Sequence, residues 1–334
     1  MASNPRSNTL TIVLGLIISG VFLYFAAKGL HWFEVARALK TANYAWLVPA
    51  LGVYFVGLYI RAIRWQFLLR HLQYLPVRRL FPVLSIGYMG NNVFPARAGE
   101  ILRASALKQV SGLPITVGLA TVIVERVFDA LVMLLLIVCT VSLFASFSGD
   151  LPFTLLLVAL CVGLIASFNV LASKPAFLVA VFDTLSGRLL PERFRAPVKS
   201  FASKFVTGLE SVRSLRSVLA VLGLSLAAWL CEATAYLIVS KAFAGMNLSL
   251  THTMMTVAVT SLVMSLPSTP GFVGTFDASC KWAVLQFGVT PALAASFTVV
   301  MHLMIWLPST IVGYAYWIII MKKGSGQRDS VGPV

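Results

Sequence analysis

Glu125, Arg126 and Asp129 lie inside one long apolar run, where ionisable side chains are costly and usually serve a function. On a helix, Glu125 and Asp129 are one turn apart and Arg126 lies three residues before Asp129, so one face carries two acids and a base. Such a face can engage an anionic group or carry protons. An internal arginine–aspartate pair that only holds this helix in place is an equally good interpretation.

A second charged face follows Pro95 and Gly99, where Arg97, Glu100 and Arg103 recur at a spacing of three. A helix that starts at such a break presents free backbone N–H groups and a partial positive charge, and arginine adds a planar fork that matches phosphate. Arg103 at the cytoplasmic interface is the alternative. For an anionic headgroup we predict the binding residues Asn91, Asn92, Arg97, Arg103 and Arg126.

Two further ionisable residues, Glu232 and His302, lie in other apolar runs. A histidine can titrate near neutral pH and relay a proton, but a lone membrane histidine is more often a hydrogen-bonded packing residue. The supporting acids or proton relay that we predict are Glu100, Glu125, Asp129, Glu232 and His302. No nucleophile–base motif, phosphate-binding glycine loop or metal-ligand cluster is present in the sequence, so we expect no catalytic residues, cofactor or metal.

These residues belong to apolar segments that are broken in the middle, at 80–110 and 250–288. The breaks are marked by Pro95, Gly99, Pro267, Pro270, Gly271 and Gly274. Irregular backbone at membrane depth survives only inside protein or beside a wet cavity, and paired interruptions of this kind indicate a transporter's substrate site. Each half of a broken segment has only about 12 to 17 residues, too short to span, so we predict two re-entrant hairpins. Full crossings remain the alternative.

The composition requires lipid as the solvent, because 59% of the 334 residues are apolar, 11% are charged and the mean hydropathy is +0.90. Uninterrupted runs long enough to span lie at 9–27, 44–69, 114–147, 151–172, 217–241 and 291–321. We therefore predict an all-α polytopic membrane protein with six transmembrane helices and two re-entrant broken-helix hairpins in an inverted repeat. The repeat units are 44–147 and 217–321 within one transmembrane domain, 1–321. An amphipathic cytoplasmic connector, 173–216, joins them, and a disordered tail, 322–334, follows.

The formal net charge of +15 comes from basic residues dispersed in short loops, which argues against nucleic acid and for anionic membrane lipids as partners. Most of the 26 lysines and arginines, Arg61 and Arg64 among them, fall on one side of this topology, so we predict that both termini are cytoplasmic. The four cysteines show neither disulfide nor zinc spacing. A homo-oligomer is left open.

The chain resembles the flippase-like family named after the transmembrane region of lysylphosphatidylglycerol synthase. The similar elements are the Arg64-Trp65 helix end, the stretch 87–100, the Glu125 to Asp129 helix, and 267–274. The resemblance implies a multi-pass protein of a prokaryotic cytoplasmic membrane that moves lipids or lipid-linked molecules between leaflets. In the bifunctional synthases a soluble aminoacyltransferase domain follows this region, and we do not expect that domain or its activity here.

Three functions follow from these residues. The first is a lipid translocase for an anionic phospholipid or lipid-linked headgroup. The second is an enzyme that modifies a lipid headgroup within the membrane, with Glu125 or Asp129 as general base. The third is an ion- or proton-coupled transporter of small solutes that uses Glu125, Glu232 and His302.

Overall fold

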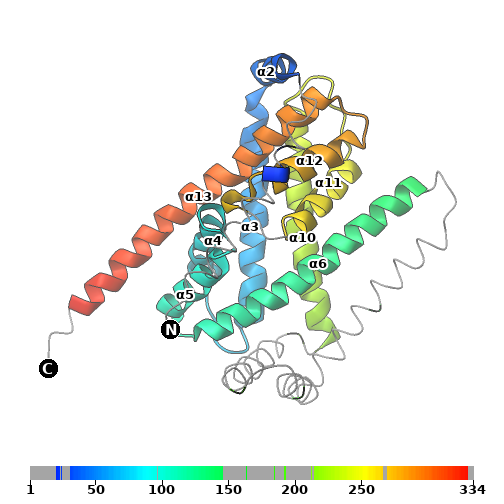
Figure 1. The fold of residues 1–334 in the computed structure, drawn as a ribbon. Coiled ribbons are helices and arrows are strands. Elements are labelled where there is room, and N and C mark those ends of the chain that lie inside the picture. Colours follow the sequence, from blue (N-terminus) through cyan, green and yellow to red (C-terminus); the bar gives the residue numbers. More distant parts are fainter. Residues whose placement is uncertain are drawn as a thin grey trace.

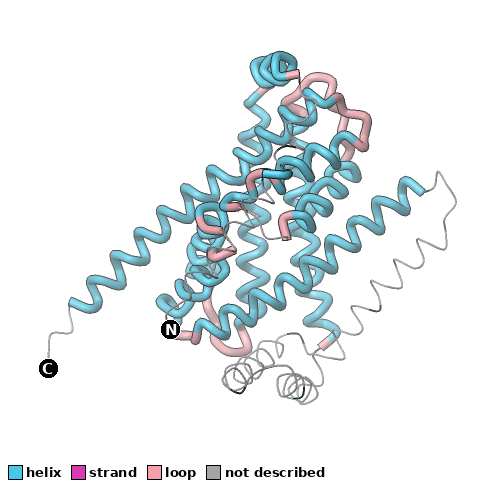
Figure 2. Tube along the Cα trace, viewed as in Figure 1, coloured by secondary structure: helices cyan, strands magenta, loops and turns pink. Residues whose placement is uncertain are grey.

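The computed structural model describes residues 31–95, 97–145, 214–265 and 269–329, together with the single residues or short pieces 20–22, 24, 163, 184, 192 and 212. This part of the chain consists of helices and loops, without a strand (Figure 1, Figure 2). The predicted spans 9–27 and 151–172 and nearly all of the connector 173–216 lie outside the described residues.

The other predicted spans coincide with long helices. These are α3 (Leu47–Leu69), preceded by the 3-10 turn η1 (Tyr44–Trp46), α6 (Ile115–Ala145), α10 (Leu215–Ser240) and α13 (Pro291–Asp329). Within the described residues, three helices are long and apolar enough to cross a membrane: Tyr44–Leu69, Leu215–Ser240 and Pro291–Lys322. A helical membrane protein is therefore confirmed, and six crossings stay a prediction. The last helix runs to Asp329, into the tail that the sequence predicts to be disordered.

The first broken segment forms α4 (Val77–Val93) and α5 (Gly99–Ser111). Phe94 takes an extended conformation because the ring of Pro95 disfavours helical geometry in the residue before it, and this ends α4. The second helix ends at Gly112, whose φ of +77° is the left-handed conformation common after helix ends. Pro95 thus places the break between α4 and α5 where the sequence predicts it.

The second broken segment forms α11 (Leu250–Val263), the short turn η3 (Pro270–Phe272) and α12 (Thr275–Leu285). The Asp277 carboxylate accepts a hydrogen bond of 2.9 Å from the Gly274 backbone N–H and so fixes the start of α12. Pro267 lies outside the described residues. The break itself matches the prediction, because no helix continues from α11 into α12.

The helices of the two predicted units make equivalent contacts, if α3, α4, α5 and α6 of the first unit correspond to α10, α11, α12 and α13 of the second. α3 packs along α10; α4 packs on α13 as α11 packs on α6; and α5 contacts α6 as α12 contacts α13. Figure 1 shows α3 and α10 side by side at the centre, flanked by the long oblique helices α6 and α13. The order of elements in the two units is the predicted one, and the inversion of the second unit stays a prediction.

One short helix, α2 (Trp32–Thr41), occupies a stretch for which the sequence reading predicts no helix. Val35 is buried against Ala292 and Ala295 of α13, whereas Phe33, on the opposite side of the helix, and Trp32, at its first position, are exposed. It precedes α3 and lies at the same end of the molecule as the start of α13 (Figure 1).

Candidate functional site

A cavity of about 350 Å³ lies at the centre of the helices and is lined from both broken segments. Side chains of α3, α4, α5, α6, α10, α11, η3, α12 and α13 contribute to its wall. The two predicted re-entrant hairpins belong to inverted units, and the arginines predicted to bind a headgroup belong to the first hairpin and to the Glu125 helix. In the structure the two breaks meet, so one cavity combines the residues of both.

Arg97 joins the first break to the second. Its Nη2 donates a hydrogen bond of 2.8 Å to the carbonyl oxygen of Met264, at the end of α11, where a cation is favoured by the helix dipole. Its guanidinium carbon lies 6.0 Å from the ring centroid of Phe272. Both residues have left-handed backbones, with φ of +55° for Arg97 and +58° for Phe272. Such strain in bulky residues is tolerated mainly at functional sites.

Helix α13 holds the two breaks together. The Asn92 amide donates to the hydroxyls of Ser309 (3.0 Å) and Thr310 (2.9 Å), and Trp306 Nε1 donates to the Asn92 carbonyl oxygen (3.3 Å). Gly271 of the second break packs against the same Trp306 side chain, because a Cβ at Gly271 would lie only 2.7 Å from Trp306 Nε1. Asn92, predicted to bind a headgroup, therefore has its amide engaged by α13.

Arg103, also predicted to bind a headgroup, is occupied by a buried carboxylate. It donates two hydrogen bonds to Glu125, of 2.6 and 3.0 Å, and its guanidinium carbon lies 3.7 Å from the ring centroid of Trp65. The two side chains are 6% and 1% exposed. The pair lies between α5 and α6 in the protein interior, so the Arg103 guanidinium points into the protein.

Two arginines that the sequence reading assigned to the cytoplasmic loop side are buried in α3. Arg64 Nη1 lies 2.6 Å from Asp129 Oδ1, and Arg61 Nη2 lies 2.7 Å from Glu232 Oε2. Trp229 completes the cluster by donating a 2.9 Å hydrogen bond to Asp129. Their burial could have been predicted from their position inside the predicted span 44–69, because charged residues within a span need partners.

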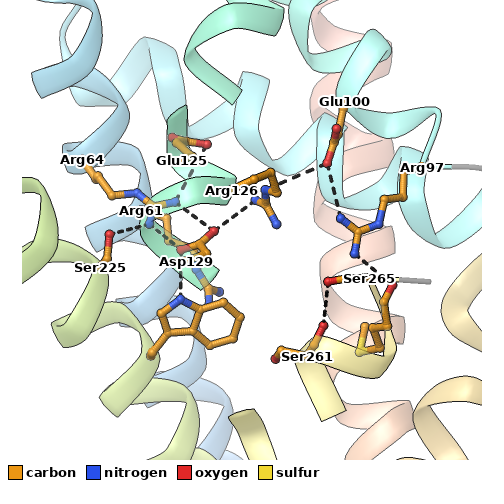
Figure 3. Close-up of polar contacts among 12 residues, drawn as sticks. Arg61, Arg64, Arg97, Glu100, Glu125, Arg126, Asp129, Ser225, Ser261 and Ser265 are labelled. Carbon is orange, nitrogen blue, oxygen red and sulfur yellow. Dashed lines mark hydrogen bonds and ion pairs between the residues drawn. The ribbon is translucent and has the colours of Figure 1, made fainter. Parts of the chain in front are cut away.

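Arg126 and Arg97 line the cavity and are the arginines of this cluster whose side chains are substantially exposed, at 42% and 28%. Arg126 lies 3.4 Å from Asp129 and 4.0 Å from Glu100, and Arg97 lies 3.8 Å from Glu100 (Figure 3). Glu100 is thus shared by two arginines through long contacts. Arg97 Nε and Asn91 Oδ1, both buried at the cavity wall, have no hydrogen-bond partner among the described residues.

The arginines and carboxylates described above form one charged network, and its positive and negative charges are not equal in number. The shortest ion pairs match Glu232, Asp129 and Glu125 with three arginines one to one, so Arg97 and Arg126 have Glu100 between them and Arg126 also shares Asp129 with Arg64. The network therefore has one more arginine than it has carboxylates. The excess positive charge lies on the cavity side, between the two exposed guanidinium groups.

His302 lies on the wall formed by α13 and the second break. Its Nδ1 is 2.8 Å from Asp277 Oδ1 and its Nε2 is 2.8 Å from the Gly271 carbonyl oxygen. The sequence reading predicted His302 as a relay or packing residue but did not pair it with Asp277. Within the described ranges, no three His, Cys, Asp or Glu side chains gather as a metal site would require.

Comparisons with known proteins identify relatives of this chain. The model of the lysylphosphatidylglycerol synthase transmembrane region matches residues 12–313. A glycosyltransferase named AglD from Haloferax volcanii is 30% identical over 89% of this chain, which spans 53% of that protein's length. A UPF0104 membrane protein of Methanothermobacter thermautotrophicus is 26% identical over 84% of this chain and 85% of its own, and one of Methanocaldococcus jannaschii is 24% identical over 95% and 96%.

Proposed function

Because the chain belongs to the family of the lysylphosphatidylglycerol synthase transmembrane region, we propose that it is a lipid translocase. It moves an anionic phospholipid, or a lipid-linked headgroup joined through phosphate, between the leaflets of a prokaryotic cytoplasmic membrane. Membrane lipids are its partners, and both termini are cytoplasmic.

The unmatched positive charge between Arg97 and Arg126 carries this proposal. A phosphodiester has one negative charge, which is the charge that the network lacks. Two guanidinium groups can hold a phosphate through charge-assisted hydrogen bonds, and Arg97 Nε donates to no other group among the residues that the structure describes. Glu100, held only at 3.8 and 4.0 Å, gives way to the phosphate without breaking a short ion pair.

The cavity has the size of a headgroup site. Its volume of about 350 Å³ lies at the lower end of the range for small-molecule pockets. A headgroup fits there, whereas the acyl or isoprenoid tails remain in the surrounding lipid. Aromatic side chains, Trp229 and Phe272 among them, line the cavity beside the arginines and give the non-phosphate part of a headgroup an apolar contact.

The architecture supports alternating access to this site. We propose that the broken segments are re-entrant hairpins of two inverted units, in a protein with six crossings. The equivalent helix contacts of the two units support a structural repeat. A substrate site at the junction of two inverted units is a recurrent arrangement in secondary transporters. Movement of one unit against the other then exposes the cavity to each leaflet in turn.

The same geometry favours transport over chemistry on the headgroup. A general base needs a carboxylate free to accept a proton from the substrate. Glu125 is held by two hydrogen bonds from Arg103, and Asp129 is held by Arg64 and Trp229. We therefore propose no catalytic residue.

Lipid movement in proteoliposomes tests this function. Fluorescent phosphatidylglycerol is reconstituted with the protein, and dithionite reports transfer between leaflets. Arg97→Ala and Arg126→Ala are each expected to slow transfer by about tenfold or more, because a hydrogen bond to a charged group contributes about 1.5–3 kcal/mol. Arg79→Ala, which removes an exposed arginine of α4 outside the cavity, is the matched control.

A second lipid separates phosphate recognition from general disturbance of the bilayer. Fluorescent glucosylceramide has a polar headgroup without phosphate and is expected to move no faster with the protein than without it. If both cavity variants transport phosphatidylglycerol as fast as Arg79→Ala does, the proposed site is wrong.

A further inference from the structure

Both ring nitrogens of His302 face oxygen acceptors. Nε2 is 2.8 Å from the carbonyl oxygen of Gly271, and Nδ1 is 2.8 Å from Oδ1 of Asp277. The Phe276 ring lies against the imidazole at a centroid distance of 4.6 Å. A packing histidine needs one donated hydrogen bond, whereas this histidine is fixed at both nitrogens.

These two contacts determine how many protons the Asp277–His302 pair holds. A carbonyl oxygen can only accept, so Nε2 must carry a hydrogen. The contact between Nδ1 and the carboxylate also needs one hydrogen, which resides either on the imidazole or on Asp277. The pair in this arrangement therefore holds one proton more than a neutral histidine beside an ionised aspartate. When that proton leaves, one of the two contacts must be lost.

The contact between His302 and the Gly271 carbonyl lies at the junction of the two broken segments. Gly271 has a φ of +69° in the second break and packs against Trp306, which donates to the Asn92 carbonyl oxygen of the first break. Gly271 and His302 both line the cavity. Release of the Gly271 carbonyl thus loosens the junction between the two broken segments.

On α12, Cys280 interacts electrostatically with Asp277, and Lys281 is the next residue of that helix. The other ionisable groups of the cavity wall are Tyr54 and Arg61 of α3, Tyr88 of α4, Glu100 of α5, Arg97 before it, Arg126 and Asp129 of α6, and Glu232 of α10. Among the described residues, Asp277 is the charged group in ion-pair contact with His302. Glu232 and Asp129 are held by Arg61 and Arg64 at 2.7 and 2.6 Å, and Glu100 lies between Arg97 and Arg126, whereas Asp277 is paired with a histidine, which can take up a proton near neutral pH.

We propose that Asp277 and His302 form a coupling-proton site. The pair binds one proton, and its release to water in the cavity breaks a contact that joins the second break to α13, so that movement of the breaks depends on the proton gradient. The coupling to lipid movement rests on the proposed function, whereas the proton-dependent change of the junction does not.

Spin-label distances test the proton site without a transport assay. Ile101→Cys in α5 and Val273→Cys beside η3 place labels on exposed positions of the two broken segments, in the full chain with Cys139, Cys161 and Cys231 replaced by alanine. The distance between the labels is measured in lipid nanodiscs at about pH 5 and at about pH 9, on either side of the usual histidine range. We expect the distance distribution to shift between the two pH values.

Asp277→Asn is the decisive variant. The asparagine amide can donate to Nδ1 while Nε2 still donates to Gly271, so both contacts form without a shared proton. Its distance distribution is expected to match that of the acidic wild-type protein at both pH values. His302→Gln, which takes up no proton, is likewise expected to show no pH-dependent shift and serves if Asp277→Asn does not fold.

The outcomes separate the two proposals. An unchanged wild-type distance across pH, or a shift in Asp277→Asn equal to that of the wild type, overturns the proton site. A pH-dependent distance in a protein that moves no phosphatidylglycerol supports the proton site and contradicts the proposed function. Phosphatidylglycerol transfer that responds to an imposed pH gradient in the wild type but not in Asp277→Asn supports both.

Discussion

Arg103 and Arg126 are predicted from sequence as equivalent phosphate ligands, and the structure gives them opposite roles. Arg103 is 6% exposed and donates two short hydrogen bonds to Glu125, which is 1% exposed. Arg126 is 42% exposed and has ion-pair distances of 3.4 and 4.0 Å. We therefore expect Arg103→Ala to lower the stability of the fold and Arg126→Ala to slow transport with little loss of stability.

The expected magnitudes follow from burial. Arg103→Ala leaves the Glu125 charge in the interior without its bidentate partner; removal of one member of a buried pair costs about 3–5 kcal/mol of folding free energy. Arg126→Ala removes a substantially exposed side chain with long contacts, and such pairs contribute about 0–1 kcal/mol. The lost cation–π contact of Arg103 with Trp65 adds to the difference.

Unfolding in mixed detergent micelles measures this difference, with the far-ultraviolet circular dichroism of the helices as the signal. Arg103→Ala should unfold at a much lower denaturant fraction than Arg126→Ala. The double variant with Arg103→Ala and Glu125→Ala should recover part of the loss, because neither charge is then left unpaired. Equal unfolding of the two single variants, or no recovery in the double variant, would refute the assignment of Arg103 to a buried structural pair.

Three further predictions concern the junction of the breaks. Gly271→Ala should lower the unfolding midpoint more than Gly288→Ala, because both glycines have positive φ but only at Gly271 would the new Cβ contact Trp306. Asn92→Ala should destabilise the folded state by about 1–3 kcal/mol through loss of the hydrogen bonds that the Asn92 amide donates to the two hydroxyls of α13, measured by the same unfolding assay. Arg97→Lys should fold like the wild type, since an ammonium can still reach the Met264 carbonyl, but should transport phosphatidylglycerol more slowly because it lacks the planar fork.

The sequence predicts the local features well because local chemistry determines them. The helix ends of α3, α6, α10 and α13 lie close to the limits of the apolar runs, although α13 continues past 321. Pro95 ends α4 through its effect on Phe94, and Gly274 starts α12 with positive φ. Each of these depends on neighbouring residues, and these are visible in the sequence.

The partners of the charged residues depend on the tertiary structure and could not be predicted from spacing. Arg61 pairs with Glu232, which is 171 positions away, and Arg64 pairs with Asp129, which is 65 away. Position alone placed both arginines with the basic loops, whereas their burial in α3 shows that they contribute to the interior. The excess charge at Arg97 and Arg126 becomes visible only after these pairs are known. The helix α2 was missed because its apolar side is short.

The most direct test is a cryo-electron microscopy structure in nanodiscs that contain phosphatidylglycerol. We expect density for a headgroup in the central cavity, with its phosphate within about 4 Å of the guanidinium groups of both Arg97 and Arg126 and with Glu100 displaced from at least one of them. The same preparation of Arg126→Ala should lose this density. A cavity without phosphate density in the wild type, with lipid bound only on the outer surface of the helices, would contradict the proposal that this cavity binds the headgroup.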